Sequence, residues 1–440
     1  MGKQNRARRA AKQRARQRPS TGANGAQSGP DWFRANEPPR VDSIERLRLR
    51  LRDAALASAR GDRSAGPRCA AELAILPRPA DVDRGAEQLM DAAIAAAWKI
   101  GWLPVDLKQL ASRRQQPLAV TYLVDAVAAQ CRQYAAGSLH PRWRAQLADM
   151  GAEVWWRPDQ PHLSQWAERH GCGRGTAIET MIDALALQAA LVPLPVIVPP
   201  PGSAVVGAAS AAHLDDKVLA RVRGLLAKAE STTFPEEAEA LSAKAQELMS
   251  RHAIERAVLD AREPGSSPPT ARRLWLDRPY VAAKASLAGA VAQANRCRTV
   301  LYEDLGFVTV VGADVDLDIV ELLTTSLLLQ ATRAMLVAGS QLTRSGQSRT
   351  RSYRQSFLIA YAGRIAERLS AATETASSGV DAGTLLPVLA GREAAVDEVF
   401  GRLFARTTAR SFSVGNSDGW YAGRAAADLA VLQGQRAVGS

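Results

Sequence analysis

Cysteine and histidine are scarce in this sequence, with four and five residues among 440. No two cysteines form a CxxC pair, and no histidine stands in an HExxH motif or at zinc-site spacing from a cysteine. Disulfide frameworks are typical of small, cysteine-rich secreted chains, and this chain is neither small nor cysteine-rich. The scarcity excludes the familiar zinc motifs and predicts reduced, packed thiols at Cys69, Cys131, Cys172 and Cys297.

Long hydrophobic runs are also missing. The longest apolar stretch, residues 184–198, is interrupted by Pro193 and Pro195 and is too short to cross a membrane. The N-terminus is positively charged, but the apolar segment of a secretion signal does not follow it. We therefore expect a cytoplasmic protein without a membrane partner.

The glycines of residues 171–175 suggest a phosphate-binding loop at first sight. The segment before them looks helical, whereas a dinucleotide-binding fingerprint needs a strand there, and the lysine of a phosphate loop is missing. We interpret these glycines as a turn between two helices.

Three alternating acids, Asp314, Asp316 and Asp318, suggest the start of a calcium loop. The sixth and twelfth positions of such a loop need glycine and glutamate, and here they hold Ile319 and Thr325. The acids are better explained as the first turn of a helix, whose positive end they offset. A GxSxG elbow is absent as well, so we predict no catalytic residue, no metal ligand and no cofactor.

Positive charge is concentrated at the N-terminus. The net charge is +12, and the first eighteen residues contain no acid and eight cations, which are Lys3, Arg6, Arg8, Arg9, Lys12, Arg14, Arg16 and Arg18. Residues 19–39 are rich in glycine, proline, serine and asparagine and bury too little apolar surface to offset the entropy of ordering. We expect a disordered basic tail over residues 1–40 and a mildly basic folded body.

Helical patterns dominate the next region, in which alanine and arginine, both good helix formers, are abundant. Residues 44–52 alternate as in a strand, but they continue into a helical stretch, and we predict a helix. Further helices are predicted over residues 83–101, 106–113, 118–134, 141–150, 161–170 and 176–191. The stacked prolines of residues 193–202 break the pattern and mark a domain boundary.

The second half of the chain divides into two predicted units. Residues 214–262 form two amphipathic helices joined by a short loop, with Pro235 in the first turn of the second helix. The C-terminal part contains a β-hairpin made of residues 298–303 and 307–311. Predicted helices surround this hairpin, over residues 280–295, 314–337, 353–371, 392–404 and 418–433, and residues 339–352 form a polar loop.

These patterns predict a mainly α protein with a small α+β C-terminal domain. The predicted order is a basic tail (1–40), a helical N-terminal domain (41–200), a linker (201–213), a central helical hairpin (214–262), a second linker (263–272) and the α+β domain (273–436).

The central hairpin resembles the family catalogued as domain of unknown function 2786 (DUF2786). The stretches Lys217–Ser231, Pro235–Ala238 and Ala243–Met249 carry the resemblance. In that family a second uncharacterised domain commonly follows, and the C-terminal part resembles it through its strands and the helix of residues 353–369. The N-terminal region resembles bacterial members of the same architecture. The resemblance implies this domain layout and brings no activity, substrate or catalytic residue.

The basic tail has a direct functional consequence. Clustered cations in an unfolded segment attract polyanions through counterion release, without specifying a sequence. A second cationic segment, the loop of residues 344–354, supplies Arg344, Arg349, Arg351 and Arg354. We therefore predict a non-enzymatic bacterial protein that binds DNA or RNA through the eight tail cations and these four arginines.

Two alternatives stay open at this point. In the first, the chain is an enzyme whose site uses no familiar motif. A deep pocket with converging acids or histidines would favour this alternative. Alternatively, the hairpin of residues 214–262 docks onto another protein, which an exposed apolar stripe on that hairpin would favour.

Overall fold

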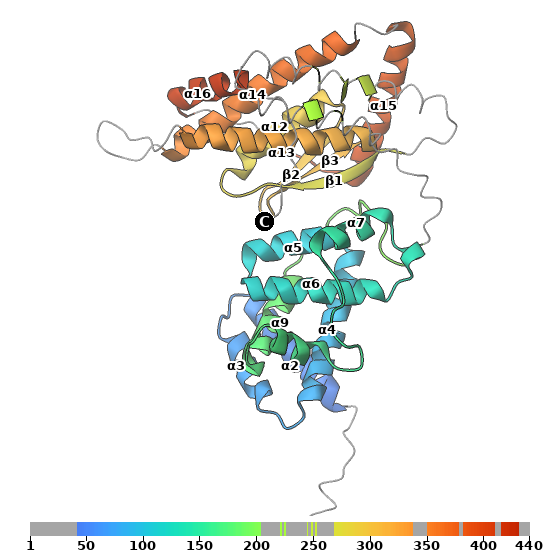
Figure 1. The fold of residues 1–440 in the computed structure, drawn as a ribbon, viewed down its shortest axis with the longest axis vertical. Coiled ribbons are helices and arrows are strands. Elements are labelled where there is room, and N and C mark those ends of the chain that lie inside the picture. The colour runs from blue at the N-terminus through green and yellow to red at the C-terminus, as the bar shows by residue number, and fades with distance from the viewer. Residues whose placement is uncertain are drawn as a thin grey trace, which may run out of the picture.

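The computed structural model describes residues 42–203, 268–337, 350–377, 382–409 and 415–430, together with eight positions between 221 and 252. The described part is mainly helical, with a small antiparallel sheet in the C-terminal half (Figure 1), which confirms the predicted fold class. The predicted basic tail, most of the central hairpin, most of the first linker and half of the second lie outside the described residues.

The N-terminal domain is a helical bundle packed around α9 (Arg174–Ala189), whose Ile178, Met181 and Ile182 are fully buried. Its other helices are α2 (Asp42–Ala59), α3 (Ala65–Ala74), α4 (Pro79–Lys99), α5 (Pro104–Arg114), α6 (Pro117–Arg132), α7 (Pro141–Met150) and α8 (His162–Arg169), with a short 3₁₀ turn at Ala136–Ser138. Four of these helices begin with proline, which lacks the N–H that a first turn leaves unpaired. The predicted helices of this region are therefore confirmed.

The alternating segment of residues 44–52 is helical, as predicted, and lies within α2. Leu51 is buried and Leu47 packs against the same core, whereas Leu49 is exposed, so the helix buries one face and leaves part of the alternating pattern in solvent. The alanine-rich α3 has no counterpart among the predicted helices, although its Cys69, Ala70 and Leu73 are buried.

The proline-rich segment that follows α9 is extended, as predicted, and belongs to the N-terminal domain. Leu194 N donates to Ile100 O at 2.9 Å, and the indoles of Trp102 and Trp143 donate to Val192 O and Pro199 O. Gly101 has a φ of +87°, and a Cβ there would lie 2.3 Å from Leu194 O. Glycine is thus required at this position by both the backbone conformation and the close approach.

The C-terminal domain is built on a three-stranded antiparallel sheet with strand order β1-β3-β2. The strands are β1 (Thr270–Trp275), β2 (Arg298–Tyr302) and β3 (Phe307–Gly312), and the helices are α12 (Val281–Ala294), α13 (Asp314–Val337), α14 (Thr350–Ser377), α15 (Ala382–Leu403) and α16 (Ser417–Asp428). The predicted β2–β3 hairpin is confirmed, with Tyr302 paired to Phe307 at its closed end.

β1 corrects the predicted domain boundary, because Thr270–Arg272 were assigned to a linker and begin a strand instead. Two adjacent arginines follow a proline there, and a hydropathy pattern counts them as solvent-exposed. The structure instead buries Arg273 against the N-terminal domain, with its side chain 2% exposed. Because β1 buries a charged residue against another domain, its sequence lacks the alternation of apolar and polar residues that indicates a strand.

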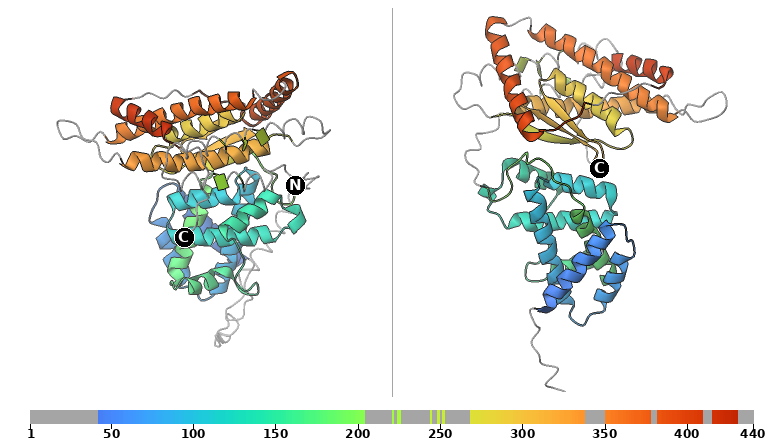
Figure 2. Two further views of the ribbon diagram at one scale, coloured as in Figure 1. Left: turned by 45° about the horizontal axis from the view of Figure 1, so that its top comes forward. Right: turned by 180° about the vertical axis from the view of Figure 1, so that it is seen from behind.

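The two faces of the sheet are covered differently. α12 and α13 cover one face, where Val308 and Val310 join their core. The opposite face meets the N-terminal domain at its Trp275–Phe307–Tyr302 end and α15 at its Ala271–Val311 end. The right-hand view of Figure 2 shows α15 lying across the strands. The sheet therefore lies at the junction between the domains.

A buried ion pair crosses this junction. Arg273 of β1 pairs with Asp106 in the first turn of α5, and both side chains are almost fully buried. Asp106 also accepts from Trp275 Nε1 at 2.8 Å and from Leu103 N at 3.2 Å. Arg273 also donates to the carbonyls of Gly101 and Pro195, both at 2.8 Å. Each buried charge thus has several partners, which is the condition for such a pair to stabilise a junction.

Two further arginines of the N-terminal domain reach the sheet. Arg113 donates to Gly306 O at 3.0 Å in the β2–β3 turn, and its guanidinium lies 4.7 Å from the Trp275 ring centroid. Arg142 donates to Ala271 O at 3.0 Å along the outer edge of β1 and pairs with Asp314. A side chain from the other domain therefore covers the start of the β1 edge.

α13 is the one helix in the described part that is long and apolar enough to match a membrane span. Its apolar residues Val315, Ile319, Leu323 and Leu327 are buried in the core of the C-terminal domain. Packing between the sheet and the other helices thus accounts for its composition, as in the core helix of a soluble protein.

α14 and α16 pack in parallel at unusually close range. A Cβ at Gly419 would lie 2.4 Å from Tyr353 O, and one at Gly423 would lie 2.3 Å from Phe357 O. Ala427, four residues further along α16, is fully buried. The small residues at four-residue spacing let the two backbones touch, and Arg368 of α14 caps α16 by donating to the carbonyls of Ala427 and Ala430.

This packing predicts a position-specific cost. Gly423→Ala is expected to lower the free energy of unfolding by about 1–3 kcal/mol, because the new methyl group has to displace α16. Gly401→Ala is the matched control, since a Cβ there meets nothing within 4 Å on α15 and alanine favours a helix by about 0.5–1 kcal/mol. Urea denaturation followed by circular dichroism measures both, and equal effects would contradict the close packing.

Candidate functional site

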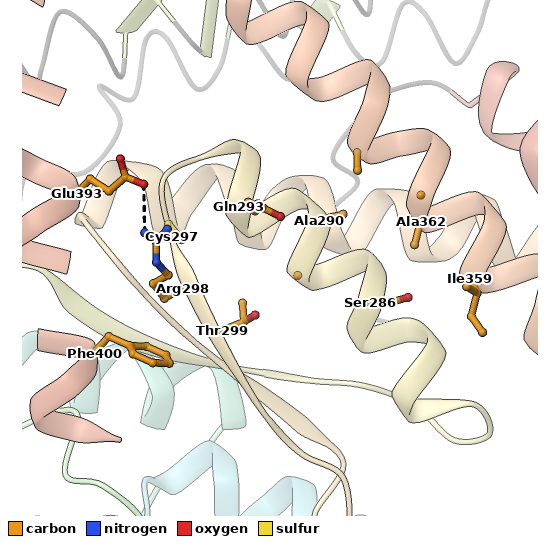
Figure 3. Close-up of a pocket in the computed structure, with 13 residues that line it drawn as sticks. Ser286, Ala290, Gln293, Cys297, Arg298, Thr299, Ile359, Ala362, Glu393 and Phe400 are labelled. Carbon is orange, nitrogen blue, oxygen red and sulfur yellow. Dashed lines mark hydrogen bonds and ion pairs between the residues drawn. The ribbon is translucent and has the colours of Figure 1, made fainter. Parts of the chain in front are cut away.

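An open cleft of about 850 Å³ lies beside the free edge of β2, between three helices of the C-terminal domain (Figure 3). We call it the β2 cleft. β2 and the residue before it contribute Cys297, Arg298 and Thr299, and the helices α12, α14 and α15 contribute Ser286, Gly289, Ala290, Gln293, Ile359, Ala362, Gly363, Ala366, Glu393 and Phe400. The cleft is of the size that small-ligand and peptide sites have.

Small side chains form the helical walls of the β2 cleft. α12 presents Gly289 and Ala290, and α14 presents Ala362, Gly363 and Ala366. A Cβ built on Gly363 would meet nothing within 4 Å. The volume of the cleft therefore arises from missing side-chain bulk rather than from a gap in the backbone.

The charged residues of the cleft already form ion pairs. Arg298 Nε lies 2.8 Å from Asp397 Oδ1, and its Nη2 lies 3.1 Å from Glu393 Oε1. Hydrogen bonds to these carboxylates raise the pKa of the Arg298 guanidinium, against the opposing effect of burial. Two carboxylates face one guanidinium, so this end of the cleft has an excess of negative charge.

Cys297 is the only cysteine among the residues that line the cleft, and it is not suited to act as a nucleophile. Its thiol is 2% exposed and donates to Asn295 O, and burial raises its pKa well above the ordinary value. A protonated thiol in an apolar setting is unreactive. A Cβ on Gly312 would also collide with its sulfur, at 2.3 Å.

A second polar cluster surrounds His162 in the first turn of α8. Its Nε2 lies 3.1 Å from Asp125 Oδ2, and its backbone N donates to Glu87, whose carboxyl pKa is raised by burial. The rings of Trp156 and Tyr122 pack against the imidazole at centroid distances of 4.1 and 5.2 Å. Apart from Trp156, these partners stand far from His162 in the sequence, so no motif could have indicated the cluster. The enclosing rings give this cluster the character of a domain core.

The glycine-rich segment and the alternating acids both lie at the starts of helices. The glycines of residues 171–175 connect α8 to α9, and Arg174 pairs with the buried Asp83. Asp314 and Asp316 lie in the first turn of α13. Each alternating acid also pairs with an arginine, namely Arg142, Arg296 and Arg272 in the order of the acids.

The sequence-predicted site residues lie only partly within the described chain. The eight tail cations, Arg344 and Arg349 lie outside it. Arg351 and Arg354 are described, and they correct the predicted loop, because α14 begins at Thr350 and includes both. No glycine or proline stands between Ser348 and Arg364 except Gly363, so nothing in the sequence delays the start of the helix.

The start of α14 carries two arginines, and the acid Asp418 in the first turn of α16 lies close enough to act on Tyr353. Arg351 is exposed, Arg354 is half-buried with an unpartnered Nε, and neither forms an ion pair in the described part of the chain. The first turn contains no acid to offset the helix dipole. The start of α16 lies beside it, since Asn416 N donates to Ser356 Oγ at 3.1 Å. In the sequence, the tail precedes α2 of the N-terminal domain, whereas Arg351 and Arg354 lie on the C-terminal domain.

Eight positions of the central hairpin are described, and all are helical. Met249 is 1% exposed within the core of the C-terminal domain, and Leu225 and Leu248 pack against that core. Arg221, Lys244 and Arg251 are exposed. At these positions the predicted apolar face is confirmed, and it faces the chain's own core.

Residues 217–256 match the family model described as protein of unknown function (DUF2786). The chain therefore carries a DUF2786 segment, which confirms the resemblance of the hairpin. No curated protein and no solved structure matches the chain. The description of the family names no activity, so a functional argument rests on the residues of this chain.

The burial of the thiols predicts their order of reactivity. At about pH 8, Ellman's reagent is expected to modify Cys172 first, because it is half-buried, whereas Cys69, Cys131 and Cys297 are buried out of reach and burial raises the pKa of each of their thiols. Cys172→Ser should abolish the fast phase, and Cys297→Ser should leave it unchanged. A fast phase that survives Cys172→Ser would show that a cysteine placed in the core is accessible.

Proposed function

We propose that this chain is a non-enzymatic, cytoplasmic bacterial protein that associates with the phosphate backbone of DNA or RNA. The observation that carries the proposal is the density of charge at the N-terminus, where eight cations and no acid stand within eighteen residues. Such a segment releases the counterions condensed on a nucleic acid, which favours binding without base recognition.

The folded body supplies a second cationic contact at the start of α14. Arginines at a helix N-terminus oppose the helix dipole and cost stability unless an anion binds there. Arg351 and Arg354 have this placement and form no ion pair within the described residues, which leaves their charge available to phosphates. The remaining arginines of this contact, Arg344 and Arg349, are proposed from the sequence alone.

The two contacts belong to different domains, and this arrangement favours avidity. A tail that is tethered to the body raises the local concentration of phosphate near the second contact, so two weak contacts reinforce each other on one polymer. A short nucleic acid that reaches only one contact would bind more weakly than a long one.

The two alternatives have less support. For the partner-docking alternative, the described apolar residues of the hairpin, Leu225, Leu248 and Met249, face the chain's own core. For the enzyme alternative, the β2 cleft contains no histidine, and its cysteine is buried and protonated.

The salt dependence of binding tests the proposal. The binding of a fluorescent DNA duplex of mixed sequence and of a single-stranded RNA is measured by anisotropy over a range of KCl concentrations. The logarithm of the binding constant should fall against the logarithm of salt with a slope as steep as about −7 for the duplex if all eight tail cations engage. Deletion of residues 1–18 should flatten this slope. Deletion of residues 19–36 should not, because that deletion removes one Asp and one Arg and leaves the net charge unchanged.

The body contact is tested with a matched pair of variants. Arg351→Gln/Arg354→Gln should weaken the remaining binding of the tail-deleted chain, whereas Arg132→Gln/Arg144→Gln, at exposed arginines of the N-terminal domain, should not. Full-length protein that binds neither DNA nor RNA in dilute buffer would overturn the proposal.

A further inference from the structure

The two edges of the sheet differ in how they are protected. Arg142 covers the start of the β1 edge, where it donates to Ala271 O and to the Thr270 hydroxyl. Outside its ladder with β3, no hydrogen bond reaches the backbone of Arg298–Leu301 in the described part of the chain. Unpaired backbone groups on an edge strand are a template for another strand, and proteins usually cover, bend or charge such an edge.

The free edge of β2 opens into the β2 cleft. In Figure 3, β2 crosses the floor of the cleft, with α12 and α14 on one side and α15 on the other. A strand added to β2 would lie about 4.8 Å away, within the cleft. Ala290, Ala362 and Phe400 are among the cleft residues that its side chains would meet.

The same geometry selects the kind of partner. A second copy of this chain would bring its own α12 and α15 to the edge, beside the helices that already flank β2. A single extended chain is thin enough to enter, and the small residues Gly289, Gly363 and Ala366 leave space for its side chains.

The charge of the cleft adds a preference for a basic residue. Glu393 and Asp397 have side chains that are 50% and 53% exposed, and within the described part of the chain both pair with Arg298. A lysine or arginine of an incoming peptide would meet the surplus carboxylate, and apolar side chains would meet Ile359 and Phe400.

We propose that β2 and the β2 cleft bind an extended peptide by β-strand addition, with main-chain hydrogen bonds to Arg298–Leu301 and a basic side chain directed at Glu393 and Asp397. This activity is independent of the nucleic-acid association proposed above, because its residues are distinct from Arg351, Arg354 and the tail.

A random peptide library displayed on phage, selected on the full-length chain, supplies the probe. The enriched peptides are synthesised, and their affinities are measured by fluorescence anisotropy. We expect β-branched residues and at least one lysine or arginine among them. Methylation of alternate backbone nitrogens should weaken binding by about tenfold or more, because it removes the donors of the ladder.

Two glycine variants locate the binding site. Gly363→Leu fills the β2 cleft from α14 without a clash, because a Cβ there meets nothing within 4 Å, and leucine is a better helix former than glycine. It should weaken peptide binding by about tenfold or more. Gly391→Leu, at an equally open glycine on α15 outside the cleft lining, should leave binding unchanged.

Three results would overturn the proposal. One is a selection in which no peptide is enriched on the full-length chain. Another is a set of enriched peptides that bind the Gly363→Leu variant as well as the parent. The third is a dimer of the parent chain that Gly363→Leu dissociates in size-exclusion chromatography, since a second copy would then occupy the edge.

Discussion

The ion pair between Asp106 and Arg273 is the constraint on which the described architecture depends. Transferring either charge from water into a core costs several kcal/mol, and only good geometry and further hydrogen bonds offset that cost. Asp106 meets these conditions with donors from Arg273, Trp275 and Leu103. Because the partners come from α5 and β1, neither domain satisfies its buried charge alone. The sheet of the C-terminal domain is therefore completed by the N-terminal domain.

This constraint determines which surfaces stay free. One face of the sheet is covered by α12 and α13, and the other is shared between the N-terminal domain and α15. Arg142 meets the edge of β1 at Ala271 O, and among the described residues no hydrogen bond outside the ladder with β3 reaches the backbone of Arg298–Leu301 on β2. The cationic start of α14 lies on the same domain, whereas the tail joins the other. The two proposed activities thus use separate parts of one scaffold.

Local patterns predicted most of the helices. Prolines at positions 79, 104, 117 and 141 start helices, and the apolar spacing of residues 314–337 matches α13 from end to end. The β2–β3 hairpin was also predictable, because a turn with Gly306 separates two apolar runs. The DUF2786 segment was recognisable because its motif residues are contiguous.

Features that depend on distant partners were not predictable. β1 was missed because Arg273 is buried only when Asp106, 167 residues away, is beside it. The β2 cleft combines residues from four elements between Ser286 and Phe400, and its volume comes from glycines and alanines that carry no motif. Likewise, the close packing of α14 and α16 depends on Gly419 and Gly423 facing the carbonyls of Tyr353 and Phe357. The periodicity of apolar residues indicates which face of a single helix is buried. It does not indicate which other element packs against that face.

A double-mutant cycle across the junction tests the central claim most directly. The free energies of unfolding are measured for the parent chain, Asp106→Asn, Arg273→Met and the combined variant. Each single substitution is expected to cost about 3–5 kcal/mol, because it leaves the other charge buried with fewer partners, and the combined variant should cost clearly less than the sum. Single costs below about 1 kcal/mol that simply add would place both side chains in water and contradict the proposed junction.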